Sequence, residues 1–179
     1  PMLGALGVVP AEEMLSQRNH AEVLIAGAKV ATQTPPVRSG RRVVFLTLDD
    51  GTGPTDAAFF DDVQAGYAAT VFHSWLLLVR GVVRRTGPRG LSVRATGAWE
   101  LGALHQAYRS GGVGAARELM EEVEREARER IAMEEEFRRG EARRVLVHAS
   151  GFRQSPYADI KPAEPTTKLW HSSPGSSGW

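Results

Sequence analysis

The side chains best suited to a functional role in this sequence are arginines, which occur in two groups. The groups are Arg38, Arg41 and Arg42, and then Arg84, Arg85, Arg89 and Arg94. Arginines that border one groove neutralise the phosphates of a bound nucleic-acid strand. The two groups therefore predict a phosphate track between them. The alternative is that these arginines only decorate solvated loops.

An aromatic side chain lies beside the first arginine group. Residues 44–48 alternate between two faces as a strand does, with Val44, Leu46 and Leu48 on one face and Phe45 and Thr47 on the other. If the aliphatic face fills a core, Phe45 points outward and can stack on a base, a contact worth about 1–3 kcal/mol. Phe59 and Phe60 face opposite ways, so one of them can join Phe45. The alternative places Phe45 under an N-terminal helix.

Other residues of catalytic type have simpler explanations. Asp49 and Asp50 are paired carboxylates of a kind that holds magnesium. They precede Gly51-Thr52-Gly53-Pro54, however, and this composition favours a hairpin turn. The histidines lack metal-ligand spacing, and no cysteine is present for a thiolate zinc site. We therefore expect no catalytic residue, no metal and no cofactor in this sequence.

Composition favours a folded protein. The chain has 179 residues, 42% hydrophobic and 24% charged, and its net charge of +1 alone predicts neither a nucleic-acid nor a membrane partner. The most apolar stretch, residues 71–83, is interrupted by His73, Ser74 and Arg80, so no membrane segment is expected. The lack of cysteine and of a signal-type leader favours a cytoplasmic location. Because the chain begins at Pro1 rather than methionine, we expect a fragment of a longer protein.

The elements that position these residues have an informative order. Strands are predicted at residues 22–32, in a hairpin over 42–60, at 75–85 and at 91–99, with a helix at 63–72. A helix between the third and fourth of five strands describes the OB-fold, a partly open Greek-key barrel. Gly27 and Gly81 stand in mid-strand and are expected to bend their strands so that the barrel closes. OB barrels bind oligonucleotides over the second and third strands, between two loops. One loop carries Arg38, Arg41 and Arg42, and the other carries Arg84, Arg85 and Arg89; Arg94 is expected on the fifth strand.

Several flanking residues are expected to support the barrel. Asp61 and Asp62 are predicted to cap the helix between the third and fourth strands. Trp75 and Trp99 flank the fourth and fifth strands, where we expect core or helix-docking roles for both.

Helices are also predicted outside the barrel. Residues 10–17 and 100–109 are typical of short helices, Ser110-Gly111-Gly112 is a break, and 114–139 is a long amphipathic helix ended by Gly140. Its charges are spaced for i,i+4 pairs: Glu121/Arg125, Glu124/Arg128, Glu126/Arg130 and Glu134/Arg138. Its apolar stripe is expected to pack on the barrel, the alternative being a partner subunit.

The predicted fold class is therefore mainly β with appended helices. We expect a leader at residues 1–21, an OB-fold domain at 22–101 and a helical appendage at 102–149. The appendage includes a candidate extra strand at 144–149. An irregular tail, rich in proline, serine and glycine, is expected at 150–179.

The barrel region of the sequence resembles a known family. The strand FLTLDDGTG, the run ending in Phe59-Phe60, the helix and the strand LLLVRGVVRR are similar to the C-terminal OB domain of bacterial C-family DNA polymerases, the polymerase III α subunit family. Within that family the sequence looks closest to the actinobacterial error-prone α-like polymerases. The resemblance is strong over residues 23–101, and the tail HASGFRQSPYADIKP is similar to the end of such a chain.

The resemblance implies a DNA-binding appendage rather than a catalytic one. The family's catalytic carboxylates would lie upstream of Pro1, so the parent chain is expected to be a DNA-directed DNA polymerase and this segment is not expected to be active alone. The implied partner is single-stranded template DNA in replication and translesion repair. An alternative is a protein-docking module for mutasome accessory proteins or the sliding clamp, although the family's clamp-binding motif is not evident. A third is an OB domain of another nucleic-acid enzyme, such as a synthetase anticodon-binding module.

Overall fold

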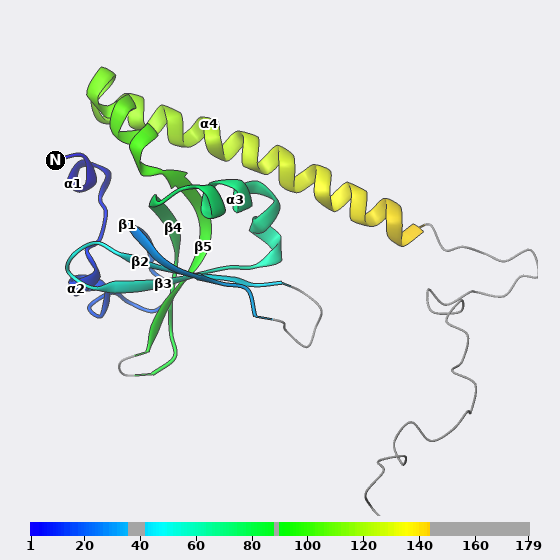
Figure 1. The fold of residues 1–179 in the computed structure, drawn as a ribbon, viewed down its shortest axis with the longest axis horizontal. Helices are drawn as coiled ribbons and strands as arrows, with labels where there is room; N and C mark the ends of the chain where they lie inside the picture. The colour runs from blue at the N-terminus through cyan, green and yellow to red at the C-terminus, as the bar shows by residue number, and fades with distance from the viewer. Residues whose placement is uncertain (36–41, 88–89, 144–179) are drawn as a thin grey trace, which may run out of the picture. The chain divides into compact units, whose positions relative to one another are not determined.

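The computed structural model describes residues 1–35, 42–87 and 90–143, and its elements follow the predicted order (Figure 1). The leader holds α1 (Met2–Leu6) and α2 (Ala11–Met14). The strands are β1 (Glu22–Gln33), β2 (Val44–Asp49), β3 (Pro54–Phe59), β4 (Leu76–Arg85) and β5 (Leu91–Glu100), with α3 (Asp61–His73) between β3 and β4. The last helix is α4 (Leu101–Arg143). None of the helices in these ranges has the length and apolar character needed to cross a membrane.

The strands form a closed barrel in the order β1-β2-β3-β5-β4. Neighbouring strands are antiparallel except β3 and β5, whose parallel pairing closes the barrel. With α3 inserted between β3 and β4, this is the arrangement of an OB-fold. The predicted fold class is therefore confirmed for the barrel and the long helix. The tail at 150–179 and the candidate strand at 144–149 lie outside the described residues.

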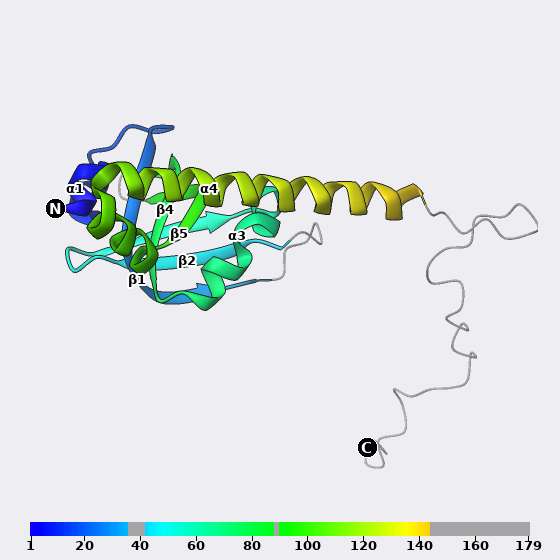
Figure 2. The ribbon, with the colours of Figure 1, turned by 90° about the horizontal axis from the view of Figure 1, so that it is seen from above.

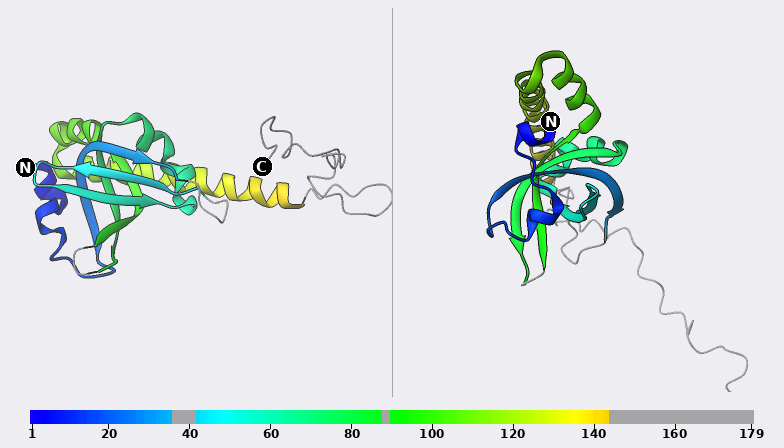
Figure 3. Two further views of the ribbon diagram at one scale, coloured as in Figure 1. Left: turned by 60° about the horizontal axis from the view of Figure 1, so that its bottom comes forward. Right: turned by 90° about the vertical axis from the view of Figure 1, so that its left-hand side faces the viewer.

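Two glycines let the barrel curve, but in different ways. The β4–β5 register shifts between Arg80 and Gly81, so the bulge predicted at Gly81 is present. In β1 the shift falls between Lys29 and Ala31, so of the bend or bulge expected at Gly27 the bulge is not at that residue. Gly27 is instead a site of close backbone approach, because a Cβ there would lie 2.6 Å from the carbonyl oxygen of Asp49. The curvature of β1 is visible in Figure 3.

One apolar core fills the barrel. Alternate side chains of each strand point inward, and Leu46, Leu77 and Val93 are completely buried there. Residues Tyr67 and Val71 of α3 belong to the same core. The prediction that the aliphatic face of β2 fills the core is therefore confirmed.

A second apolar core lies on the outer side of the barrel wall, against α1 and α4. It is formed by Ala26, Leu78 and Trp99 from the strands, Met2 and Leu6 from α1, and Leu104, Ala116 and Met120 from α4. Figure 2, seen from above, shows α4 running across β4 and β5. The indole Nε1–H of Trp99, whose exposed fraction is 1%, donates to the carbonyl oxygen of Met120 at 3.0 Å. The predicted local packing of the long helix is therefore confirmed.

The long helix α4 contains a kink. Gly111 and Gly112 have non-helical backbone angles, and Gly112 has φ 69°, which only glycine adopts readily. The break predicted at Ser110-Gly111-Gly112 is thus present, whereas the helix continues past Gly140 to Arg143. Of the predicted charge pairs, Glu126 and Arg130 are 3.5 Å apart. Glu124 instead bonds to Arg80 of β4, which ties α4 to the barrel.

Several sequence predictions need correction. Trp75 is not in a core: its exposed fraction is 76%, and it lies against Lys29, whose Nζ is 5.5 Å from the ring centroid. Asp61 and Asp62 do not cap α3; they occupy its first turn, where the helix dipole favours acids, and Phe60 is the N-cap residue. The leader also contains α1, which the sequence did not predict.

Candidate nucleic-acid interface

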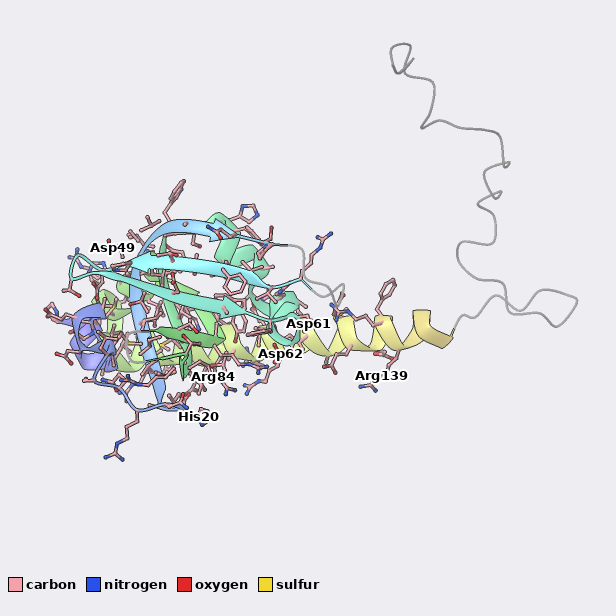
Figure 4. All side chains as sticks on the ribbon, turned by 90° about the horizontal axis from the view of Figure 1, so that it is seen from below. His20, Asp49, Asp61, Asp62, Arg84 and Arg139 are labelled. Carbon is pink, nitrogen blue, oxygen red and sulfur yellow. The ribbon has the colours of Figure 1, made fainter. Side chains whose placement is uncertain are left out.

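The outer face of the β2–β3 hairpin is the part of the barrel wall that the second core does not include. Figure 4, seen from below, shows this hairpin with Asp49 at its turn and with Asp61 and Asp62 at its other end. Two aromatic side chains are exposed there, with exposed fractions of 42% for Phe45 and 36% for Phe60. Phe45 therefore points outward as predicted. Its packing under an N-terminal helix, the alternative, is not observed.

Strand register places the key side chains in one row. Phe45 pairs with Ala58, Ala58 pairs with Arg94, and Arg94 pairs with Val82. Directly paired residues lie on the same face of a sheet, so this row crosses the outer wall from β2 to β4. Neighbouring strands are about 4.8 Å apart, which puts Phe45 and Arg94 roughly 10 Å apart across β3. Ala58, which is 6% exposed, lies between the ring of Phe45 and the guanidinium group of Arg94 in this row.

Arg94 is the arginine of this row, and it already has partners. Its Nη2 lies 2.8 Å from Oδ2 of Asp62, and its Cζ lies 4.8 Å from the ring centroid of Phe60. The side chains of Arg94 and Asp62 are 39% and 53% exposed, so the ion pair is at the surface. Phe60, Asp62 and Arg94 thus form a compact cluster where α3 begins beside β5.

The remaining predicted arginines have different environments. Arg84 is exposed, and its Nη1 lies 3.2 Å from Nε2 of His20; Figure 4 shows both near the end of β4. Arg85 is bound to the leader, because its guanidinium donates to the carbonyl oxygens of Leu15 and Gln17. Arg42 is exposed just before β2. Three others, Arg38, Arg41 and Arg89, lie outside the described residues.

The backbone near Arg42 is anchored to α3. The side-chain amide of Gln64 donates to the carbonyl oxygens of Arg42, at 2.5 Å, and of Phe59, at 2.8 Å. This bridge fixes the start of β2 to the end of β3. The Arg42 side chain therefore projects from a backbone position that is fixed relative to Phe45.

Acidic side chains also lie on the hairpin. Asp56, an outward residue of β3, accepts a hydrogen bond from the Thr47 hydroxyl at 2.6 Å. Thr47, predicted to face a bound strand, is therefore engaged with a carboxylate. Acidic and basic groups alternate over this surface, and phosphates would have to follow the arginines and avoid Asp56.

The hairpin turn accounts for the paired carboxylates. Asp49 Oδ1 accepts the Gly51 N–H at 2.7 Å, and Asp50 Oδ1 accepts the Thr52 N–H at 2.8 Å. Asp50 Oδ2 also accepts the N–H of Ala11, which anchors α2 to the turn. Although desolvation raises the pKa of Asp50, hydrogen bonds from Ala11, Thr52 and Gly53 outweigh it and lower the pKa below its usual 3.8. The turn interpretation is confirmed, and no cluster of three metal-binding side chains exists in the described part of the chain.

One arginine outside the predicted site, Arg80, has a structural role. The guanidinium of Arg80 stacks on Trp99, with Cζ 5.0 Å from the ring centroid, and bonds to Glu124 of α4. Its second acidic neighbour is Glu22, at 3.8 Å. The pairing of Arg94 with Asp62 was also not predicted. The two residues are 32 positions apart, and no local pattern links them.

Comparison with known proteins supports this view of the barrel. Residues 23–101 match the family model described as an OB-fold nucleic acid binding domain. An error-prone DNA polymerase of Caulobacter vibrioides is 40% identical over 84 residues, covering 47% of this chain and 8% of the relative. One from Mycobacterium tuberculosis H37Rv is 37% identical over 82 residues, covering 46% of this chain and 7% of the relative. The resemblance predicted from the sequence is therefore confirmed.

The chain spans only 7–8% of the length of these curated relatives. Among solved structures, asparaginyl-tRNA synthetase from Pyrococcus horikoshii aligns with 51% of this chain and 22% of its own, at 19% identity and a TM-score of 0.43. RecG bound to a three-way DNA junction aligns with 51% of this chain and 12% of its own, at 15% identity and a TM-score of 0.39. These structural likenesses are too weak to carry a functional argument.

Proposed function

We propose that this barrel binds single-stranded template DNA over the outer face of β2, β3 and β5. The observation that carries the proposal is the row Phe45–Ala58–Arg94, which sets an exposed ring and a guanidinium on one uncovered face. The matching nucleic-acid-binding family model and the error-prone polymerase relatives support it. The domain would act in a cytoplasmic polymerase chain of the error-prone C-family during replication and translesion repair.

Stacking and phosphate neutralisation would share the binding. A base would lie on Phe45, with Phe60 offering a second ring near Arg94. Phosphates would pair with Arg94 and with the exposed Arg42 and Arg84. Every base has a flat aromatic face, so such contacts tolerate any sequence. The domain would therefore hold template without reading it, as copying of varied or damaged DNA requires.

The test is fluorescence anisotropy with a labelled oligothymidine of about 16 nucleotides, the upper end of the site size for one OB barrel. Phe45→Ala is expected to weaken binding by about 5- to 150-fold, which corresponds to one stacked base at about 1–3 kcal/mol. Arg42→Ala is expected to flatten the plot of log affinity against log salt by about 0.7, the value for one lost phosphate contact on a single strand.

The matched control is Arg109→Ala, because Arg109 is an exposed arginine on α4 outside this face. Its affinity and salt slope should equal those of the wild type. If Phe45→Ala and Arg42→Ala also leave both quantities unchanged, the strand does not bind on this face.

A second candidate function is protein docking, and an apolar groove favours it. The groove is lined by Pro1, Met2, Leu3, Leu76, Leu101, Gly102, His105, Tyr108 and Arg109. Residues 101–117 contain no acidic side chain. We propose that an apolar partner segment with a carboxylate for Arg109 would occupy it, supplied by an accessory protein of the mutasome or by the sliding clamp.

Charge reversal tests this docking. Peptides selected from a displayed random library on the wild-type chain should carry apolar anchors and acids, and should not bind Leu76→Glu. Selection on Arg109→Glu should then enrich basic peptides. Peptides that bind Leu76→Glu equally well, or a charge preference that does not reverse, would exclude the groove as the docking site.

A further inference from the structure

The guanidinium group best placed for a phosphate already holds an anion. Arg94 lies on β5 on the outer face, paired in register with Ala58 of β3, which in turn pairs with Phe45 of β2. Its Nη2 is 2.8 Å from the carboxylate of Asp62. A carboxylate and a phosphate offer an arginine the same type of acceptor, so one excludes the other from the same guanidinium nitrogen.

Asp62 is held in this position by the fold. It is in the first turn of α3, where the positive end of the helix dipole favours a negative charge. The helix begins directly after β3, and α3 contacts β5, so the start of α3 brings Asp62 to Arg94. Phe60 packs against the same guanidinium from the residue before the helix, with Arg94 Cζ 4.8 Å from its ring centroid.

The pair is also easy to open. The side chain of Asp62 is 53% exposed, so its carboxylate returns to water when it leaves Arg94. Exposed ion pairs contribute little free energy, which makes exchange of one anion for another inexpensive. Contact of Arg94 with Phe60 does not depend on the carboxylate and can keep the guanidinium in place during the exchange.

We propose that Asp62 is an internal competitor of the bound strand, occupying on Arg94 the place that a backbone phosphate takes in the complex. This inference rests on the proposed binding of single-stranded DNA and specifies what limits the affinity of that same site. The bound strand stacks one base on Phe45 and presents a neighbouring phosphate to Arg94. The carboxylate of Asp62 then points into solvent. Asp62 thereby lowers the affinity of the barrel, so that template is held loosely enough to move through it.

The experiment compares four variants of the full chain by anisotropy with the same oligothymidine. Asp62→Asn keeps the shape of the side chain and removes its charge. Asp56→Asn is the matched control, because Asp56 is an exposed acid of the same face whose hydrogen bond is to Thr47 rather than to an arginine. Arg94→Ala and the double variant Asp62→Asn/Arg94→Ala complete the cycle. Circular dichroism verifies that each variant is folded.

Asp62→Asn is expected to bind about 2- to 5-fold more tightly than the wild type, since one anionic competitor is lost. Its salt slope should steepen by up to about 0.7, since Arg94 now neutralises one phosphate in full. Asp56→Asn should change affinity less. The double variant should bind the oligonucleotide no more tightly than Arg94→Ala alone.

Each other result has a definite meaning. If Asp62→Asn binds no more tightly than the wild type, or if the gain survives in the double variant, Asp62 does not compete on Arg94 and the inference is overturned, while binding by the wild type still stands. If Asp56→Asn gains as much as Asp62→Asn, the effect is general charge repulsion and the inference is again overturned. If the wild type and all variants fail to bind, the proposed function itself is wrong.

Discussion

The two tryptophans that flank β4 and β5 offer a sharp test of the fold. Trp99 is 1% exposed, and its indole N–H bonds to the Met120 carbonyl at 3.0 Å. Its ring also contacts Tyr67 edge-on, with centroids 6.4 Å apart, and lies under the guanidinium of Arg80. Trp75, by contrast, is 76% exposed. The same substitution to phenylalanine should therefore have very different effects at the two positions.

Trp99→Phe removes one buried hydrogen bond and the volume of the indole's second ring. The hydrogen bond contributes about 0.5–1.5 kcal/mol net, and the Met120 carbonyl keeps only its helical donor. The cavity adds about 1–2 kcal/mol. A total loss of about 1.5–3.5 kcal/mol lowers the Tm of a chain of this size by roughly 3–14 °C. Trp75→Phe should change stability by less than about 0.5 kcal/mol, as exposed substitutions do.

The assay is urea unfolding followed by far-ultraviolet circular dichroism, which does not depend on the replaced fluorophore. Amide hydrogen exchange in residues 101–120 provides a second measurement, and it should quicken in Trp99→Phe because α4 loses its attachment to the barrel. Equal losses of stability for the two variants would refute the reasoning. So would a Trp99→Phe variant whose midpoint and exchange rates match the wild type.

Two further predictions concern the hairpin turn and the helix contact. Because the pKa of Asp50 is lowered in the folded state, its hydrogen bonds stabilise the fold above its usual pKa of 3.8, and this contribution is lost as pH falls through the lowered value. Asp50→Ala should thus cost about 1 kcal/mol in urea unfolding at pH 7 and converge with the wild type in strong acid; a constant gap at every pH would contradict this. Gly66→Val should destabilise by about 1–3 kcal/mol, because a Cβ at Gly66 would lie 2.9 Å from the Cβ of Ala127 on α4; a thermal scan showing no loss would mean that the helices separate without cost.

Much of the barrel could be predicted from local patterns. The alternation in β2 indicated correctly which side chains fill the interior, because the two-residue period of a strand is fixed by its backbone. Turn composition after Asp49 placed the hairpin, and the glycines at 111–112 placed the kink in α4. These features depend on residues close together in the sequence.

Features that depend on distant residues could not be predicted. Trp75 and Trp99 both lie at the end of a barrel strand, and the nearby sequence does not indicate that α4 covers Trp99 and leaves Trp75 exposed. Arg85 resembles the arginines beside it, yet it binds carbonyl oxygens 68 and 70 positions earlier. Counting arginines in the sequence therefore overestimated how many of them are available to bind phosphates, since Arg85 and Arg94 have partners from other elements.

Closure of the barrel has a consequence for how the chain acquires its structure. In β1, Glu22 pairs with Val82, sixty positions later, whereas β2 and β3 are joined by a short turn. The hairpin can form early, but the other edge of β1 has no partner until β4 has been synthesised, and contacts of such long range slow folding. A nascent chain would meanwhile expose an unpaired strand edge, the feature that invites aggregation. Truncations that end before β4 should therefore precipitate rather than yield a smaller folded core.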